Sequence, residues 1–332
     1  MRNQDYLKGK PSALHFLRQY ALVILLAVLA MAFSLMAPTF LSGRNLGNIL
    51  IVQVTTGCMS IGALLILIVN EFDLSLGYLL GFCMMLGAWL AKSGFGPAVI
   101  IPAMLLASVL AGFLSGIMTV KCKVSSFIST LAVGITLSGF TTGMSGGSVL
   151  SSNIPAVIIS FGQKRFLGIG YCVWAMLLLL AVMYYTLEHT TFGRSLYAIG
   201  GSERVAFLGG IKTDRVRILV FMLAGLFTGI AAISQLGQSG SANPSYGAEM
   251  LMPAYAMALL SMTAYKLGNY NVVGLVLSML VVGVGVNGLG LIGAPYWMEH
   301  LFNGIVLIIA VLISIKERNA RKNARKGDDH GC

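Results

Sequence analysis

The sequence predicts an all-α, polytopic membrane protein with about ten transmembrane helices. Apolar residues make up 57% of the 332 residues and charged residues only 10%, whereas a soluble domain has about a quarter of its residues charged. The charges crowd into a few short stretches, and apolar runs of near bilayer-spanning length lie between them. Because lipid offers backbone groups no hydrogen-bond partners, spans of this kind must be helical.

Ten apolar runs are expected to cross the membrane, and two of them, 76–91 and 251–264, are short. Together they form a transmembrane domain over residues 20–315, which follows an N-terminal segment, 1–19, and precedes a polar, basic tail, 316–332. The predicted spans are 20–37, 49–69, 76–91, 98–118, 127–143, 169–187, 218–236, 251–264, 272–291 and 298–315.

The first run, 20–37, is interpreted as an uncleaved helix rather than a signal peptide. It follows three basic residues, Lys8, Lys10 and Arg18, as a signal core would. However, its small-x-small sequence, Ala30–Ala32, lies inside the run, and the run is longer than an ordinary signal core.

The positions of the basic residues predict the orientation. If the N-terminus is cytoplasmic and every span crosses, 18 of the 22 Lys and Arg residues fall on the inside and four on the outside. This asymmetry follows the positive-inside rule and places both termini in the cytoplasm of a bacterial cell, with the chain in the inner membrane. The net charge of +11 lies at the ends of spans, so we expect no nucleic-acid partner.

Glycine spacing predicts where the helices pack closely. Four pairs have the small-xxx-small spacing of close helix contacts: Gly77/Gly81, Gly112/Gly116, Gly139/Gly143 and Gly225/Gly229. If spans two to five and seven to ten form two pseudo-repeated halves, the two short spans occupy matching positions with opposite direction. Such matching short spans indicate the translocation site in repeat-built transporters.

No set of residues predicts catalysis, a cofactor or a metal. The five cysteines show neither a CxxC pattern nor metal-ligand spacing, and the four histidines form no catalytic set with the scattered acids. The sequence also lacks a G-x-x-x-x-G-K-[ST] phosphate loop, so energy from ATP would have to come from another subunit. An ion-gradient secondary transporter or a channel is the alternative, although no predicted span carries a charge deep within it.

The longest inside connection, 188–217, predicts a small helix outside the membrane. Ser202 is placed to N-cap a helix through Leu208, and Gly209 to end it. A short capped helix with apolar side chains is suited to a groove in another protein. The alternative is a loop that folds back on its own helix ends.

Three ordered motifs resemble the ribose-type sugar permeases of the ATP-binding-cassette superfamily, a family that also carries sugar-like signals such as autoinducers. They are Phe192–Ile211, with its Phe-Gly-Arg and Tyr-Ala-Ile-Gly-Gly sequences, Phe72–Gly77, and Lys123–Leu131. The resemblance covers roughly residues 15–315. It implies that 188–217 contains the coupling helix, which binds the ATPase. The residues that match this role are Gly193, Arg194, Tyr197, Gly200, Ser202, Ala206 and Leu208.

The resemblance also implies the partners: two cassette ATPases inside, a periplasmic or lipid-anchored solute-binding protein outside, and a second permease copy in the surrounding membrane lipid. One stretch, Leu259–Asn271, departs from the family, which usually has paired glycines there. Only Gly268, Asn271 and Gly274 keep the pattern. The departure leaves open which sugar is carried and whether the second copy is identical or a paralogue.

The translocation path is expected to be uncharged and polar, as suits a neutral monosaccharide or similar solute. Asp73 has two interpretations, an N-cap of the third span or a residue of the path. Asn287 and Asn303 suit hydrogen bonds between helices better than substrate contact. The candidates for the path are Asn70, Asp73, Ser75, Phe127, Tyr246, Glu249 and Asn287.

Overall fold

The structure, a computed structural model, describes residues 20–312. The predicted segment 1–19, the tail 316–332 and the last residues of the tenth predicted span lie outside this range. Seven described helices have the length and hydropathy of membrane spans: α3 (Gly43–Ile68), α4 (Ser75–Lys92), α5 (Pro97–Val120), α6 (Ser126–Ser145), α8 (Tyr171–His189), α11 (Thr213–Ser239) and α13 (Val272–Leu291).

Three shorter helices coincide with the remaining predicted spans: α2 (Ala21–Met36), α12 (Tyr246–Leu260) and the last helix, Trp297–Leu312. A single 3-10 turn, Ser261–Thr263, extends α12. The all-α, polytopic architecture is therefore confirmed, and the count of ten crossings stays a prediction.

Two long helices begin earlier than hydropathy predicts. The second predicted span starts at residue 49, but α3 starts at Gly43, where Ser42 accepts a hydrogen bond from the Asn45 amide. The seventh predicted span starts at residue 218, but α11 starts at Thr213. Both extra segments carry polar residues, which lower the mean hydropathy below that of a membrane span. Such residues are compatible with a helix end that lies in water or among polar partners.

The connections contain elements that were not predicted. Between α6 and α8 lie a short helix, α7 (Ala156–Gln163), and a hairpin of β1 (Arg165–Phe166) and β2 (Ile169–Gly170). The predicted inside loop contains two helices rather than one, α9 (Thr191–Gly201) and α10 (Glu203–Leu208). These elements are too short for an apolar period to be recognised.

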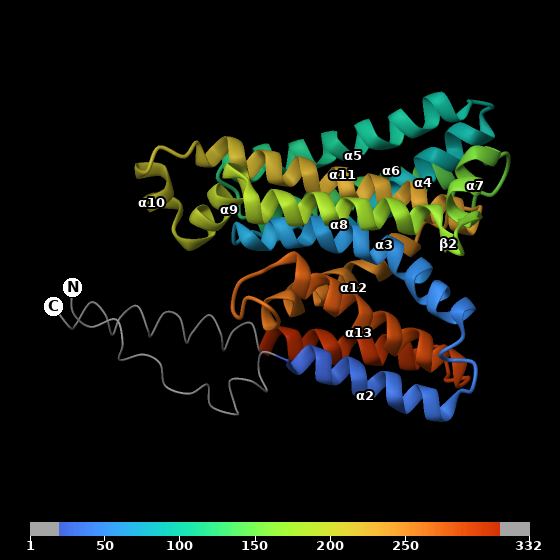
Figure 1. Cartoon of the computed structure of the whole chain (residues 1–332). Helices are drawn as coiled ribbons and strands as arrows, with labels where there is room; N and C mark the ends of the chain where they lie inside the picture. Colours follow the sequence, from blue (N-terminus) through green and yellow to red (C-terminus); the bar gives the residue numbers. More distant parts are fainter. Residues whose placement is uncertain (1–19, 313–332) are drawn as a thin grey trace, which may run out of the picture.

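The bundle has two distinct ends (Figure 1). α9 and α10 lie at one end, called here the α10 end, and α7 with the hairpin lies at the opposite end. The blue beginning of α2 and the red end of the described chain lie toward the α10 end. α5 and α11 pack together along one edge of the bundle, and α2 and α13 pack together along the other.

Three of the four glycine pairs lie at close contacts between helices. A Cβ added at Gly112 would lie 2.3 Å from the Phe221 carbonyl oxygen, and one at Gly225 would lie 2.3 Å from that of Ser108, so α5 and α11 meet backbone to backbone. The Gly77/Gly81 pair meets α12. Around Gly139 and Gly143 there is no atom within 4 Å among the described residues, so this face of α6 is open.

Candidate functional site

α10 is a short, well-defined helix at one end of the bundle. The Ser202 hydroxyl accepts a hydrogen bond from the Val205 amide at 3.4 Å, and the Gly209 amide donates to the Val205 carbonyl at 2.9 Å. The predicted start after Ser202 and end at Gly209 are therefore confirmed. The left-handed φ of +85° at Gly210, a conformation that costs glycine little, then turns the chain back toward α11.

The two faces of α10 differ sharply. Ala206 is buried against the bundle, whereas Val205, Phe207 and Leu208 are 67%, 64% and 77% exposed. Arg194 on α9 is also exposed. Of the residues matched to the coupling role, Leu208 and Arg194 are therefore accessible to a partner and Ala206 is not. The sequence did not single out Phe207.

α9 fastens this region to the transmembrane helices. The Tyr197 hydroxyl donates to the Tyr270 carbonyl oxygen at 2.8 Å, and burial, with the nearby Glu188 carboxylate, raises the pKa of Tyr197. A Cβ at Gly193 would lie 2.4 Å from the Leu187 carbonyl oxygen, and one at Gly200 would lie 1.9 Å from that of Ile68. These glycines are needed for close approach and leave no side chain to bind a partner.

A partly buried arginine joins α10 to two further elements. Arg217, in the first part of α11, forms ion pairs with Glu203 on α10 and with Glu71 in the connection between α3 and α4. The side chains of Arg217 and Glu71 are only 15% and 13% exposed. Beside this cluster the Asn70 side-chain amide donates to the Gly200 carbonyl oxygen. α10 is therefore linked to residue 71 through Arg217, and α9 is linked to residue 70 through Gly200.

The same connection continues to a buried carboxyl group. The Oδ1 atom of Asp73 accepts hydrogen bonds from the Ser75 amide at 2.9 Å and from its hydroxyl at 2.5 Å, so Asp73 caps the first turn of α4. Burial raises the pKa of Asp73 to about 6, against the lowering by the Ser75 bonds. The Tyr255 hydroxyl on α12 accepts from the Asp73 amide at 2.7 Å and donates to its carbonyl at 3.0 Å.

α4 and α12 cross at glycines. A Cβ at Gly77 would lie 2.9 Å from the Gly247 carbonyl oxygen, and a Cβ at Gly247 would lie 2.1 Å from that of Gly77 and 2.5 Å from the Gly81 amide nitrogen. α4 and α12 are thus in direct backbone contact here, and they are joined again where Tyr255 meets Asp73. Neither helix can shift far without the other.

Two polar clefts lie on either side of this crossing. Toward the opposite end, a cleft of about 360 Å³ between α4, α6 and α12 has no charged residue in its lining. Its polar side chains are those of Tyr78, Ser138, Thr141, Thr142 and Ser245. Toward the α10 end, a cleft of about 600 Å³ lies beside Glu71, Glu203 and Arg217.

Contacts between α4 and α6 separate the two clefts. The Leu74 amide donates to the Thr130 hydroxyl at 3.0 Å, and the Phe72 amide donates to that of Ser126 at 3.3 Å. One turn further along, a Cβ at Gly134 would lie 2.5 Å from the Tyr78 ring. These contacts close the space between the two clefts.

A family profile described as "Branched-chain amino acid transport system / permease component" matches residues 45–311. The ribose import permease protein RbsC of Escherichia coli K12 is 30% identical over 91% of this chain and 95% of its own length. The L-arabinose ABC transporter permease protein AraH of Azospirillum brasilense is 26% identical over 91% and 88%. The autoinducer 2 import system permease protein LsrC of E. coli K12 (DH10B) is 27% identical over 89% of each.

The chain belongs to this family of ATP-binding-cassette import permeases. The resemblance inferred from the three motifs is confirmed, and the permease is a multi-pass protein of the bacterial inner membrane.

In the stretch Leu259–Asn271, where the resemblance led us to expect paired glycines, Asn271 organises the turn. The Asn271 side-chain amide donates to the carbonyl oxygens of Ser261 and Ala264, each at 2.9 Å, and its oxygen accepts from the Gly274 amide at 2.7 Å. A Cβ at Gly274 would lie 1.9 Å from the Ser261 carbonyl oxygen. The chain therefore turns tightly without the second glycine.

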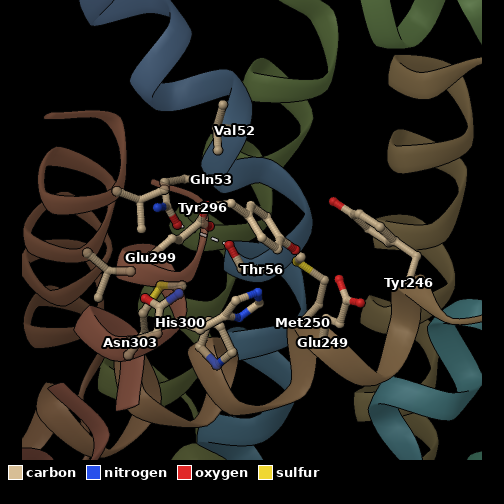
Figure 2. A pocket seen from close by; sticks show the side chains of 14 residues that line it. Val52, Gln53, Thr56, Tyr246, Glu249, Met250, Tyr296, Glu299, His300 and Asn303 are labelled. Carbon is tan, nitrogen blue, oxygen red and sulfur yellow. Dashed lines mark hydrogen bonds between the residues drawn. The ribbon is translucent and has the colours of Figure 1, made fainter. Parts of the chain in front are cut away.

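The remaining candidates for the path of the permease are dispersed. Phe127 is exposed on α6, and Asn287 exchanges amide hydrogen bonds with Asn45 at 2.9 and 3.1 Å, an interhelical contact of the kind expected for it. Tyr246 and Glu249 line a third pocket, among α3, α12, α13 and the last helix (Figure 2). Asn70, Asp73 and Ser75 thus lie at the connection into α4, Tyr246 and Glu249 share one pocket, and Phe127 and Asn287 belong to neither group.

Proposed function

We propose that the permease forms half of a translocation path for a neutral monosaccharide or similar solute, driven by ATP hydrolysis in a partner subunit. The observation that carries the proposal is the exposed apolar face of α10, Val205, Phe207 and Leu208, on a capped helix that Arg217 ties to the transmembrane helices. Relatives whose names state ribose, L-arabinose and autoinducer 2 support a sugar-like solute.

The ATPase would bind α10 in the cytoplasm. Movement of its binding site would displace Glu203, and through Arg217 would displace Glu71 and the start of α4. Because Tyr255 holds Asp73, α12 would move with α4. That displacement would part α4 from α6 at Thr130 and switch the path between its two clefts.

The path would run along α4, α6 and α12. Its uncharged outer cleft, with hydroxyl groups from Ser138, Thr141 and Thr142, offers hydrogen bonds without attracting ions, which suits a sugar. A second copy, identical or paralogous, would cover the open face of α6, where Gly139 and Gly143 permit close approach. A solute-binding protein would deliver the solute at the opposite end.

This scheme places the α10 end inside and rests on ten crossings with two pseudo-repeated halves, one from α3 to α6 and one from α11 to the last helix. The crossing of α4 with α12 at glycines, where the matching spans 76–91 and 251–264 were predicted, supports the halves. Under the same scheme 188–217 is the coupling segment of a transmembrane domain over 20–315, and 1–19 and 316–332 are cytoplasmic.

The test is to co-express the permease with its ATPase and replace the exposed face of α10 by Phe207→Asp with Leu208→Asp. Burying an apolar side chain contributes about 1.5–3 kcal/mol, so losing two anchors should weaken ATPase capture by roughly a hundredfold or more. The matched control is Leu167→Asp in the hairpin at the opposite end, where Leu167 is 79% exposed.

Retention of the ATPase by the double variant, with normal uptake in ATP-loaded proteoliposomes, would refute the coupling assignment. Uptake that continues without any ATPase and stops with a protonophore would instead establish the ion-gradient alternative.

A further inference from the structure

The pocket among α3, α12, α13 and the last helix belongs to neither cleft of the proposed path. Its volume is about 120 Å³, which equals about four water molecules at ~30 Å³ each. Figure 2 shows the carboxylates of Glu249 and Glu299 and the rings of Tyr246, Tyr296 and His300 among its lining side chains.

The pocket carries two carboxylates and no lining Lys or Arg among the described residues. Glu249 lies in the first turn of α12, and Glu299 is the third residue of the last helix. The partial positive charge at a helix N-terminus interacts favourably with a carboxylate there. Both lie close enough to the Tyr246 hydroxyl to interact with it electrostatically.

One polar atom in the lining of the pocket is left without a partner by the described protein. The Oδ1 atom of Asn303 is buried and accepts no hydrogen bond within residues 20–312. Gln53, also in the lining, is only 5% exposed, and its oxygen accepts from the Thr56 hydroxyl at 3.0 Å. Buried polar groups are ordinarily hydrogen-bonded, so the Asn303 oxygen points to a ligand with a hydrogen-bond donor.

The mouth of the pocket is aromatic. The rings of Tyr296 and His300 meet edge to face, with 4.7 Å between their centroids. Tyr296 and the next residue, Trp297, are strongly exposed. Exposed Tyr and Trp at the end of a membrane helix indicate the level of the lipid headgroups. Tyrosine faces beside carboxylates are also the usual surroundings of a bound ammonium ion.

We propose that this pocket binds a primary ammonium group, with Glu249 and Glu299 balancing its charge and the Asn303 oxygen accepting one of its N–H bonds. The volume accommodates the four heavy atoms of an ethanolammonium unit, and the Gln53 amide can donate to its oxygen. Two sources carry that group, an ethanolamine phospholipid in the leaflet at this level and a free amine. A neutral polyol would bring no positive charge to the two carboxylates.

The experiment uses the full chain with its co-purifying partners, delipidated and then titrated with phosphatidylethanolamine, phosphatidylglycerol or free ethanolamine, with bound molecules counted by native mass spectrometry. The variants are Glu249→Gln with Glu299→Gln, and the matched control is Asp214→Asn, an exposed acid at the α10 end. We expect phosphatidylethanolamine to bind at least about tenfold more tightly than phosphatidylglycerol, and the double variant to lose that preference.

Saturable binding of free ethanolamine alone would support the ammonium site and assign its source to a soluble amine. Equal binding of both lipids by wild type, an unchanged preference in the double variant, or displacement by ribose would overturn it. If the double variant fails to fold, the single variants Glu299→Gln and Tyr246→Phe provide the same readout. Because coupling at α10 is not involved, ATPase capture in these variants should stay at the wild-type level.

Discussion

The two ends of the bundle differ in whether their acidic side chains form ion pairs. At the α10 end, acids and bases meet: Arg217 with Glu71 and Glu203, Lys266 with Glu188, and Lys121 with Asp214. At the opposite end, Glu249 and Glu299 face a pocket, and neither has an ion pair within residues 20–312. Ion pairs join elements of one protein, whereas carboxylates without a basic partner are available to bind a ligand.

The largest effect is expected from Arg217→Met. The change would leave the largely buried Glu71 without its partner, and removing one member of this partly buried pair should cost about 3 kcal/mol, the lower end of the range for fully buried ion pairs. The free energy of unfolding, measured by equilibrium denaturation in mixed micelles, should fall by that amount and ATPase-driven uptake should be lost. Adding Glu71→Gln should recover part of the stability. No recovery would show that the contribution of Arg217 is packing alone.

A smaller loss is expected from Gly247→Ala, at the crossing that joins the two ends. Its Cβ would lie 2.1 Å from a backbone oxygen on α4, which no rotamer change relieves, and overpacking of this kind costs about 1–3 kcal/mol. The matched control is Gly139→Ala, where the described protein leaves open space and α6 gains helix propensity. Equal losses of unfolding free energy in the two variants would mean that α4 and α12 separate easily.

Asp73→Asn should raise stability at neutral pH. In the folded protein the pKa of Asp73 is about 6, above its ordinary value of 3.8, so the folded state holds its proton more tightly than the unfolded state. The wild type is therefore most stable below about pH 4 and loses stability as the pH rises through about 6. Asparagine keeps the acceptor for Ser75 and removes this loss, a gain of about 1–3 kcal/mol at pH 7.5.

The check for Asp73 is a pair of unfolding titrations between pH 4 and 8. The wild-type curve should slope downward relative to the variant only between the two pKa values. Parallel curves would show that Asp73 is charged in the folded protein.

The smallest effect on stability is expected from Glu249→Gln. The carboxylate has no basic partner in the described protein, so the variant leaves no basic side chain without an ion pair. Its unfolding free energy should therefore change by less than about 0.5 kcal/mol. A loss comparable to that of Arg217→Met would remove the contrast between the two ends.

Hydropathy and charge predicted the helical architecture because long apolar runs and clustered basic residues are local features. The cap at Ser202 was likewise predictable, since one hydroxyl and the next turn of backbone define it. The roles of Glu71 and Arg217 were missed because they pair across 146 positions in the chain. Nothing near either residue indicates the other.

The candidate site shows the same limit. The hydroxyls of Ser138, Thr141 and Thr142 lie on one side of α6, and only the packing of α4 and α12 beside them reveals a cleft. The sequence pointed to Tyr246 and Glu249, and it assigned Asn303 an interhelical hydrogen bond, but it did not point to Glu299 on the last helix. The i, i+3, i+4 spacing of these three hydroxyl residues indicates one polar side of α6, a pattern that hydropathy alone does not reveal.

The paired amides of Asn45 and Asn287 restrict how this protein can diverge. Each side chain donates to the other, so replacing either one strands a polar group between α3 and α13. Two apolar residues could fill the same space. If the two substitutions occur one at a time, however, the first gives a destabilised protein. Across descendants of this gene, positions 45 and 287 should consequently change together or not at all.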